Sequence, residues 1–463
     1  MLTFLLQSLN ARAAMLIGLE TILIVGSVGL GASFLLGRQE AWSTVGTAIG
    51  FLKAALIALV CQACLFYEDL YDLRVVADRR ELFARTFHSL AAASLILAAV
   101  YFLLPDLGVG QGVVMAAALL VMATIPGWRM AFESVVRRAA PRERLVIVGT
   151  SPAAVSLATE LTDRRYVLGL EIVGFVTGTA SQAHGAPVKV LGEVSDIPTI
   201  VRTHHVDRVV VSLADARGTL PMERLLEMKL NGVTFDHLAS VYERYTGKIA
   251  IENLRPSWLI FSAGFRTTRG VLAVKRTLDV AVSLAALIVA LPIMAIVALA
   301  VKVSSPGPVL YHQQRVGERG RVFTLHKFRS MGIDAEAGSG AVWSQNGDTR
   351  VTPVGRFLRK ARLDELPQLW NVMRGDMSLV GPRPERPEFI LRLTQQIPYY
   401  GQRHVVKPGL TGWAQVRYTY GSSVEDAMEK LQYDLFYIKH MSLGMDLLIA
   451  LSTVKTVLSR RGV

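Results

Sequence analysis

The sequence predicts a membrane protein with α and α/β parts: an N-terminal four-helix transmembrane bundle, a Rossmann-like parallel-sheet domain and a mainly helical C-terminal domain. Three observations predict this fold class. The 463 residues are 51% apolar and 19% charged, with a mean hydropathy of +0.37, which places part of the chain in lipid. The middle alternates β-branched runs with helical stretches, and the last third is polar and basic. We expect boundaries at 1–130 for the bundle, 144–240 for the sheet domain, 241–269 for a linker and 270–463 for the C-terminal domain.

The balance of charge indicates an anionic partner. The net charge is +13 and the pI is near 9.8. Such a balance fits nucleic acid, an anionic membrane face or phosphorylated substrates. No module of interleaved aromatic and basic residues occurs, so we expect a lipid bilayer and phosphorylated small molecules and no nucleic acid.

Four apolar segments open the chain, each about the ~20 residues that cross a hydrocarbon core: Ala13–Leu36, Thr44–Phe66, Thr86–Leu104 and Gln111–Trp128. Arginines follow the second and fourth segments, whereas the turn after the third, "PDLGVGQG", has no lysine or arginine. The positive-inside rule therefore predicts that both ends of the bundle are cytoplasmic. The first segment is too long for a signal peptide and lacks a cleavage site, so we interpret it as a retained helix.

The two cysteines of the chain, Cys61 and Cys64, form the motif "CQAC" inside the second apolar segment. A CxxC motif can bind metal or exchange disulfides, but here no further cysteine or histidine cluster accompanies it. We predict ordinary lipid-facing packing and assign the pair no function.

Alternating strands and helices are predicted from Arg144 to about Ala239. The expected strands are "RLVIVG", "LEIVGFV", "DRVVVSL" and "GVTFDHL", with helices at "SPAAVSLATELTDR" and "LPMERLLEMKLNG". The first turn, "VGTSPAAV", lacks GxGxxG, and no clear ribose-binding acid follows. A degenerate regulatory or scaffolding domain is therefore favoured over a dinucleotide site.

A fifth apolar run follows the linker, with 22 uncharged residues between Asp279 and Lys302 and Pro292 near its middle. Lys275 and Arg276 precede it, so both of its ends are basic. A spanning helix would carry the basic C-terminal region outside, against the charge bias. We predict a re-entrant membrane helix at 276–303 that breaks at Pro292; a straight, kinked span is the alternative.

The C-terminal domain holds the candidate chemistry. From Ser305 to Val463 it carries 22 lysines and arginines against 14 acids. Asp364 and Glu365 are adjacent, and Pro367 predicts a helix that begins at one of them and offers its N-terminus to a phosphate. Either carboxylate can bind Mg²⁺ on a phosphate or attack phosphorus, and both can equally be helix-capping groups.

Basic residues around this acidic pair favour phosphoryl transfer. Arg359 and Arg362 precede it, Lys327 and Arg329 lie in "KFRS", and Arg383 is fixed between Pro382 and Pro384. A guanidinium held between two prolines loses little entropy when it binds a diphosphate, and arginine suits bidentate phosphate contacts. We predict that the five basic side chains contact substrate phosphates.

Residues 275–463 resemble the bacterial polyprenyl-phosphate sugar-1-phosphotransferases, also called monotopic phosphoglycosyl transferases. The resemblance is carried, in order, by "KRTLDV", "SPGPVLYHQQRVG", "FTLHKFRSM", "LRKARLDELPQLWNVMRGDMSLVGPRP", "VKPGLTGWAQV" and "YDLFYIKH". The preceding bundle and Rossmann-like domain are similar to the large form of this family, whose members start exopolysaccharide, capsule or O-antigen units.

The resemblance implies a ping-pong transfer of a sugar 1-phosphate from a UDP-sugar to undecaprenyl phosphate, which releases UMP. It implies that Asp364 is the nucleophile and that Glu365 is the ligand of Mg²⁺, or of Mn²⁺ in its place. Pro382, Pro384 and Gln415 are then expected in a nucleotide-binding or structural part of the site. The family often has Ser-Pro at the membrane break, where this chain has Leu291-Pro292.

The resemblance also implies where the protein works and with what. It places the protein in the bacterial inner membrane, with the catalytic domain on the cytoplasmic face. A homodimer and other polysaccharide-assembly enzymes are the implied protein partners. Glucose and galactose lead as the transferred sugar, ahead of N-acetylated sugars.

Two other functions stay open at this point. One is a polytopic phosphosugar transferase without a covalent intermediate, although the chain has few spans for that class. The other is a nucleotide-sensing membrane subunit of a polysaccharide machinery that has no transferase activity. The intact "LDE" and "GPRP" motifs argue against the second function.

Overall fold

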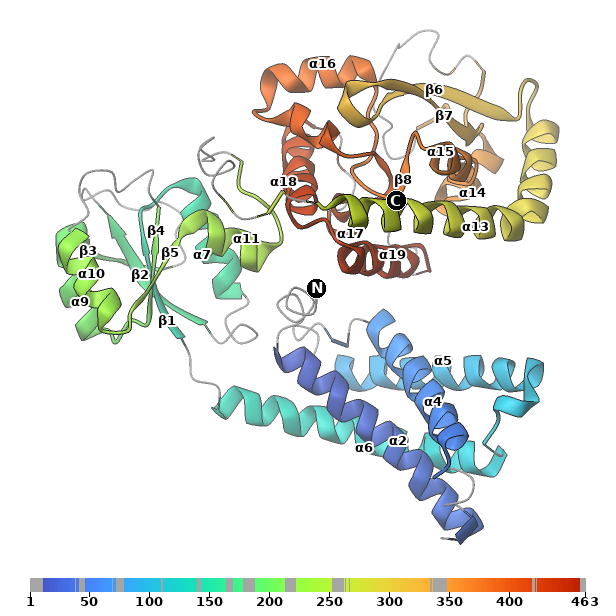
Figure 1. The fold of residues 1–463 in the computed structure, drawn as a ribbon, viewed down its shortest axis with the longest axis horizontal. Helices are drawn as coiled ribbons and strands as arrows, with labels where there is room; N and C mark the ends of the chain where they lie inside the picture. Colours follow the sequence, from blue (N-terminus) through green and yellow to red (C-terminus); the bar gives the residue numbers. More distant parts are fainter. Residues whose placement is uncertain are drawn as a thin grey trace. The chain divides into compact units, whose positions relative to one another are not determined.

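The computed structural model describes residues 11–37, 39–40, 46–68, 70–71, 79–109, 111–139, 143–163, 170–177, 188–212, 222–251, 262, 264–265, 267–333, 335, 348–418, 421 and 423–458. Its elements follow the predicted order: apolar helices, a parallel sheet, a long apolar helix and a mainly helical C-terminal region (Figure 1). The predicted fold class is thus confirmed.

Four long helices form the N-terminal bundle: α2 (Ala11–Leu36), α4 (Ala48–Tyr67), α5 (Arg79–Leu103) and α6 (Gln111–Ala139). Each contains a stretch long and apolar enough to cross a membrane, as predicted. A 3-10 turn, η2 (Pro105–Leu107), joins α5 to α6.

The interior of the bundle differs from the prediction at one motif. Cys61 and Cys64 are only 6% and 7% exposed and pack in the apolar core shared by the four helices. The expectation that they face lipid is wrong, because their side of α4 faces the other helices. Both are free cysteines.

A buried ion pair fixes α2 against α6. The Arg129 guanidinium lies 2.6 Å from one Glu20 oxygen and donates to the other at 3.0 Å. The Tyr71 hydroxyl donates to the same carboxylate at 2.8 Å. Charges inside a membrane bundle are costly unless they are paired, so this contact ties the two helices in one register.

The α/β region is a five-stranded sheet in the order β3-β2-β1-β4-β5. Its strands are β1 (Glu143–Val148), β2 (Leu170–Thr177), β3 (Val190–Glu193), β4 (Arg208–Val211) and β5 (Thr234–His237). The strand pairs β1–β4, β2–β3 and β4–β5 are parallel. The four predicted strands are confirmed, whereas β3 escaped prediction because it is four residues long and contains no buried residue.

Helices cover both faces of this sheet (Figure 1). They are α7 (Pro152–Asp163), α9 (Ile197–Thr203), α10 (Met222–Leu230) and α11 (Leu238–Thr246). The apolar sides of α9 and α10 share one buried cluster with the strands. The predicted linker at 241–269 needs correction at its start, because its first residues complete α11; residues 252–261 of it lie outside the described chain.

The C-terminal region begins with α13 (Arg269–Ser304), a helix of 36 residues with Pro292 inside it. Figure 1 shows this helix turning sharply, so that its yellow second half runs steeply away from its olive first half. A bend at a proline follows from the lost backbone hydrogen bond and the ring's clash with the preceding turn. The helix remains continuous across the proline.

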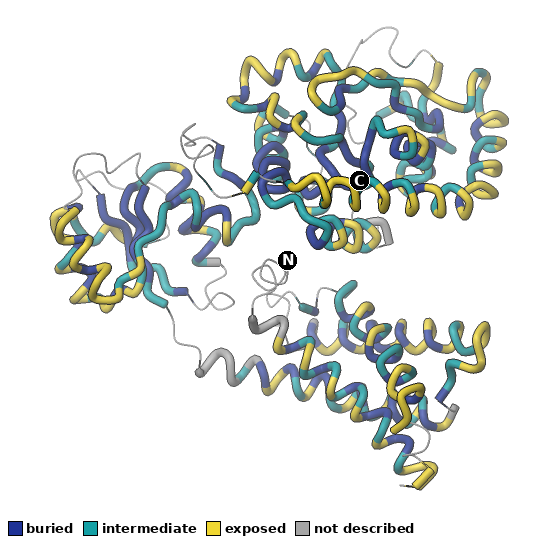
Figure 2. Tube along the Cα trace, in the orientation of Figure 1, coloured by how far each residue is buried: buried dark blue, intermediate teal, exposed yellow. Residues whose placement is uncertain are grey.

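Both ends of α13 contact the folded C-terminal domain. Near its start, Arg276 donates to the Val372 and Met373 carbonyls, each at 2.6 Å. Near its end, Val297 and Val301 belong to a buried cluster of that domain. The side chains around the proline are open instead, with Ile288, Val289 and Leu291 each at least 66% exposed, and Figure 2 shows yellow along this helix.

The rest of the domain is built from short elements. The hairpin β6 (Leu310–Val316) and β7 (Val322–Phe328) turns at η4 (Glu318–Gly320). Then follow α14 (Pro353–Lys360), η5 (Leu363–Glu365), α15 (Gln368–Arg374), β8 (Ser378–Val380), α16 (Pro387–Gln396), η6 (Tyr400–Val405), β9 (Gly409–Thr411), α17 (Trp413–Arg417), α18 (Val424–His440) and α19 (Leu443–Leu458).

Candidate active site

The acidic pair lies in a tight turn and not at the start of a helix. Asp364 and Glu365 belong to the 3-10 turn η5, and helix α15 begins only at Gln368. Arg362, just before the turn, is left-handed with φ 56°. The predicted helix start at the acidic pair is therefore wrong, and the seven-residue α15 gives no N-terminal phosphate site. The turn places two adjacent carboxylates in one basic cluster.

Glu365 is clamped by two guanidinium groups. Arg383 Nη2 lies 2.9 Å from Glu365 Oε1, and Arg362 Nη1 lies 3.6 Å from Oε2. Burial alone would raise the pKa of this carboxyl, but the charges of Arg383 and Arg362 outweigh burial and hold the pKa well below its usual range. Glu365 is thus ionised at neutral pH.

Asp364 has the opposite character. It is 8% exposed, and among the described residues its carboxylate accepts no hydrogen bond. Burial and the neighbouring Glu365 raise the pKa of Asp364, against the attraction of Lys327, Arg359 and Arg383. Its oxygens are therefore uncommitted within a positive environment.

Lys327, which is half-buried on strand β7, supplies an ammonium group to this cluster. Burial, together with the charges of Arg315 and Arg383, lowers the pKa of Lys327 to about 8, although the two acids oppose the shift. A lysine in this state is positively charged at pH 7 and neutral well above pH 8.

The charge of Arg359 acts on Asp364 from helix α14, whose position depends on a glycine. Arg359 Nε donates to the Ser330 hydroxyl at 2.9 Å. A Cβ atom at Gly355, one turn earlier, would overlap the carbonyl oxygen of Ser330. Only glycine lets α14 approach the "KFRS" segment so closely, which explains the glycine of "VGRFLR".

Arg329 does not join the cluster. Its guanidinium is 6% exposed and donates to the carbonyls of Ser305 and Pro306 at 2.8 and 2.7 Å. These bonds tie the chain just after α13 to the end of β7. Arg329 thus anchors the end of the membrane helix, and its predicted contact with a substrate phosphate stays a prediction.

The "GPRP" segment lies against "KPGLTG" with unusually close backbones. Strand β8 pairs with β9 in parallel. A Cβ atom at Gly381, Gly409 or Gly412 would overlap the backbone of the facing segment. The glycines of both motifs are explained by this approach, which fixes where the following Arg383 stands.

Pro382 and Pro384 flank Arg383, and Gln415 belongs to the short helix α17 that follows strand β9. Gln415 donates weakly to the Leu410 carbonyl at 3.4 Å, and its buried Oε1 has no hydrogen-bond partner within the described chain. The sequence reasoning also overlooked Arg315, whose charge acts on Lys327 and whose guanidinium donates to the Pro384 carbonyl at 2.9 Å. Its signal was the "QRVG" that ends strand β6.

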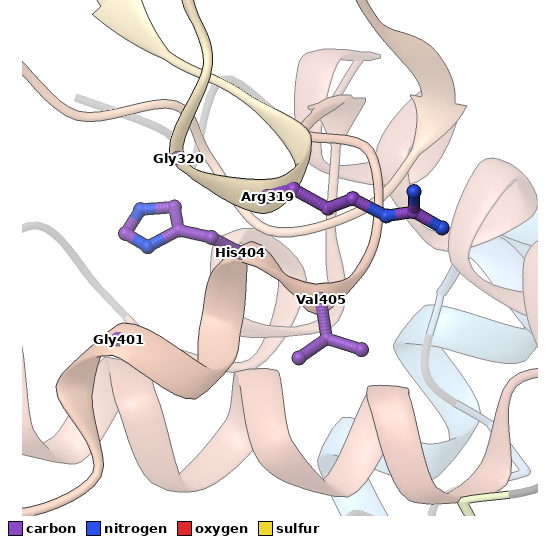
Figure 3. Close-up of a pocket in the computed structure, with 5 residues that line it drawn as sticks. All are labelled: Arg319, Gly320, Gly401, His404 and Val405. Atoms are coloured by element: carbon purple, nitrogen blue, oxygen red, sulfur yellow. The ribbon is translucent and has the colours of Figure 1, made fainter.

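A separate hollow of about 350 Å³ lies between η4 and η6. Figure 3 shows that it is lined by Arg319, Gly320, Gly401, His404 and Val405, and the drawn Arg319 guanidinium extends away from the His404 ring. Burial, and then the charge of Arg403, lowers the pKa of His404 to about 4, so this ring is neutral. None of the residues of the acidic and basic cluster lines this hollow.

Two family models match the chain. Residues 271–460 match the model described as bacterial sugar transferase, and residues 67–220 match the model described as CoA-binding domain. The first match contains every residue of the cluster described above.

Curated relatives share this region. The chain is 40% identical over 258 residues to a UDP-N-acetylgalactosamine-undecaprenyl-phosphate N-acetylgalactosaminephosphotransferase of Aeromonas hydrophila, covering 55% of this chain and 60% of the relative. It is 34% identical over 334 residues to a UDP-glucose:undecaprenyl-phosphate glucose-1-phosphate transferase of Xanthomonas campestris, covering 69% and 67%. It is 40% identical to an exopolysaccharide production protein of Rhizobium leguminosarum, covering 41% and 97%.

Proposed function

Since this chain belongs to the bacterial sugar transferase family, we propose that it transfers a sugar 1-phosphate from a UDP-sugar to undecaprenyl phosphate in exopolysaccharide synthesis. The observation that carries the proposal is the acidic pair of Asp364 and Glu365 inside a cluster of four basic side chains. A diphosphate substrate supplies the negative charge that such a cluster attracts.

The different states of the two acids suggest different roles. Asp364 is the nucleophile: one of its oxygens attacks the sugar-bearing phosphorus, the bond to the bridging oxygen breaks, and UMP leaves. An oxygen of undecaprenyl phosphate then attacks the same phosphorus, which releases Asp364 and forms the lipid diphosphate sugar. The uncommitted carboxylate of Asp364 supports this assignment, because the nucleophile must approach phosphorus freely.

Lys327, Arg359, Arg362 and Arg383 hold the phosphates during both steps. A carboxylate and a phosphate are both negatively charged and repel each other. The positive charges of these four side chains offset that repulsion as Asp364 approaches the phosphate. Arg383 and Arg362 in addition keep Glu365 ionised.

The carboxylates also fit a Mg²⁺ ion that arrives with the diphosphate. Glu365 Oε2 has only a 3.6 Å contact with Arg362, which leaves it available as a ligand. Within the described chain no group of three or more potential ligands gathers, and Mg²⁺ commonly takes one or two carboxylates together with substrate phosphates. Glu365 would hold the ion, which would neutralise charge on the phosphate oxygens.

UMP release tests the proposed function. The full-length protein in detergent is incubated with a panel of UDP-sugars that includes UDP-glucose and UDP-N-acetylgalactosamine, with and without undecaprenyl phosphate. We expect UMP in proportion to lipid product for one donor, and one UMP per enzyme without acceptor. A complete lack of UMP with all donors would favour an assembly subunit without transferase activity, and a strict need for acceptor would favour direct transfer without a covalent intermediate.

Lys327 should give the reaction an alkaline limit. As pH rises through about 8, Lys327 loses its proton and its attraction for the substrate phosphates, so kcat/KM should fall. In Lys327→Arg the side chain stays charged throughout this pH range. The alkaline fall in kcat/KM should therefore disappear in this variant, even if its maximal kcat/KM is lower than that of the wild type. The measurement is kcat/KM for the UDP-sugar from pH 6.5 to 9.5; an unchanged alkaline limit in the arginine variant would contradict the role.

A re-entrant α13 would keep the catalytic domain on the cytoplasmic face. Both ends of α13 contact one folded domain, which supports this topology. Gly270→Cys and Leu310→Cys, each in a Cys61→Ala/Cys64→Ala background, should react with an impermeant maleimide only from the cytoplasmic side. Asp106→Cys, in the turn between the third and fourth apolar helices, is the control and should react from outside. Labelling of position 310 from outside would show that α13 spans the membrane.

A further inference from the structure

The four carbonyl groups from Pro382 to Glu385 are each held by a separate donor. In chain order these donors are Gly409 N at 2.9 Å, Arg403 Nη2 at 3.0 Å, Arg315 Nη1 at 2.9 Å and Val316 N at 3.0 Å. Pro382 and Pro384 have no N–H group, so the segment is anchored mainly through its carbonyls. The place of the Arg383 side chain therefore depends on these donors.

Arg403 is the donor that holds Arg383 itself. Its Nη2 also donates to Asp434 Oδ2 at 2.8 Å, and its Nη1 donates to the Tyr400 hydroxyl at 2.6 Å. These three side chains are 5%, 1% and 2% exposed. Arg403 comes from η6 and Asp434 from helix α18, so two distant parts of the chain meet behind the "PRP" segment.

Packing alone gives no reason to bury these two charges. The desolvation of a buried ion pair can exceed the attraction between its partners, and apolar residues of similar volume often replace such pairs without loss of stability. What an apolar pair cannot supply is a hydrogen bond to the Arg383 carbonyl. The side chain of Arg383 in turn donates from Nη2 to Glu365 Oε1 at 2.9 Å.

We propose that Arg403, oriented by Asp434, is a positioning residue for the transfer reaction: it fixes the backbone of Arg383 so that the Arg383 guanidinium lies between Glu365 and the substrate phosphates. This role rests on the proposed function. Among the described residues, Arg403 itself forms no hydrogen bond or ion pair with Asp364 or Glu365. A shift of about 1 Å in a group that holds the substrate can cost about 100-fold in rate, so the effect should be measurable.

The first test separates positioning from stability. Arg403→Met alone leaves Asp434 as a buried unpaired charge and is expected to destabilise the protein. The double variant Arg403→Met/Asp434→Leu removes both charges and should recover a melting temperature near that of the wild type. Its kcat/KM should nevertheless stay at least about 10-fold low, because Arg383 still lacks its donor. Wild-type kcat/KM in this double variant would overturn the proposal.

The second test asks whether Arg403 acts through Arg383. In the Arg383→Ala background, adding Arg403→Met/Asp434→Leu should cost less than about threefold in kcat/KM, since the side chain to be positioned is already gone. Equal fold losses in the two backgrounds would show that Arg403 acts elsewhere and would overturn the proposal. In the wild-type background, much of the loss in kcat/KM should result from a higher KM for the UDP-sugar.

A second ion pair on α18 provides the matched control. Lys248 and Glu429 join the chain after α11 to α18. The double variant Lys248→Met/Glu429→Leu should keep kcat/KM within about twofold of wild type; a loss equal to that of the Arg403 pair would overturn the specific role of Arg403. If the wild type released no UMP, the proposed function would fail, whereas UMP release with additive losses would overturn only the role of Arg403.

Discussion

Replacing Asp364 by asparagine is expected to lower sugar 1-phosphate transfer by at least about 1,000-fold while the protein stays folded. An amide oxygen cannot form the acyl phosphate on which both steps depend. The change also removes a buried carboxyl that burial and Glu365 already disfavour in its charged form, so stability should not fall. The measurement is UMP release per enzyme, together with the melting temperature.

A mass measurement and a control variant make this test more specific. Without acceptor, the wild type should gain the mass of one sugar phosphate, located by peptide mapping at Asp364, and the asparagine variant should gain none. Asp376→Asn is the matched control, because the half-buried Asp376 pairs with the exposed Arg374 at 3.5 Å and lies outside the cluster. Turnover by Asp364→Asn above about one per cent of wild type would rule out the nucleophile.

Local patterns were sufficient to predict the membrane helices and four of the sheet strands. Apolar runs of helical length and short β-branched runs consist of consecutive residues, so these elements can be predicted without knowledge of tertiary contacts. Predictions from local patterns failed where the environment of a residue depends on tertiary contacts. Cys61 and Cys64 face the bundle interior, which a uniformly apolar helix does not reveal.

The candidate site was predictable as a set of charges but not as an arrangement. Lys327 and Arg329 are two residues apart and would share a face of a continued strand. The strand ends at Phe328, however, so Arg329 leaves it and binds the carbonyls that follow α13. The sequence contains no local sign of that turn.

Arg403 and Asp434 show the same limit at longer range. They are 31 residues apart, and although Asp434 stands in the motif "YDLFYIKH", Arg403 lies outside every motif and nothing local links the two. Their pairing depends on how η6 packs against α18. Polar residues that act through tertiary contacts are thus the part of a site that motif reasoning overlooks.

Arg383→Ala is expected to lower kcat/KM by about 100-fold, since a charged donor to the substrate phosphates is lost. The loss should come with a shift in pH dependence. Arg383 is the largest of the charges that hold the pKa of Glu365 low, so its removal raises that pKa and lets Glu365 take up a proton at a higher pH. The acidic limit of kcat/KM should therefore move to higher pH, and Arg383→Lys should restore most of that limit but less of the rate, because lysine lacks the bidentate fork.

Arg374→Ala provides the matched control for this change. The Arg374 side chain is 64% exposed and, among the described residues, forms an ion pair with Asp376 alone, so its loss should leave both the rate and the acidic limit within error of wild type. The two measurements answer separate questions: the rate reports phosphate binding by Arg383, and the acidic limit reports its hold on Glu365. A normal acidic limit in Arg383→Ala would show that Arg362, at 3.6 Å, keeps Glu365 ionised alone, and that the 2.9 Å pair serves the substrate and not the acid.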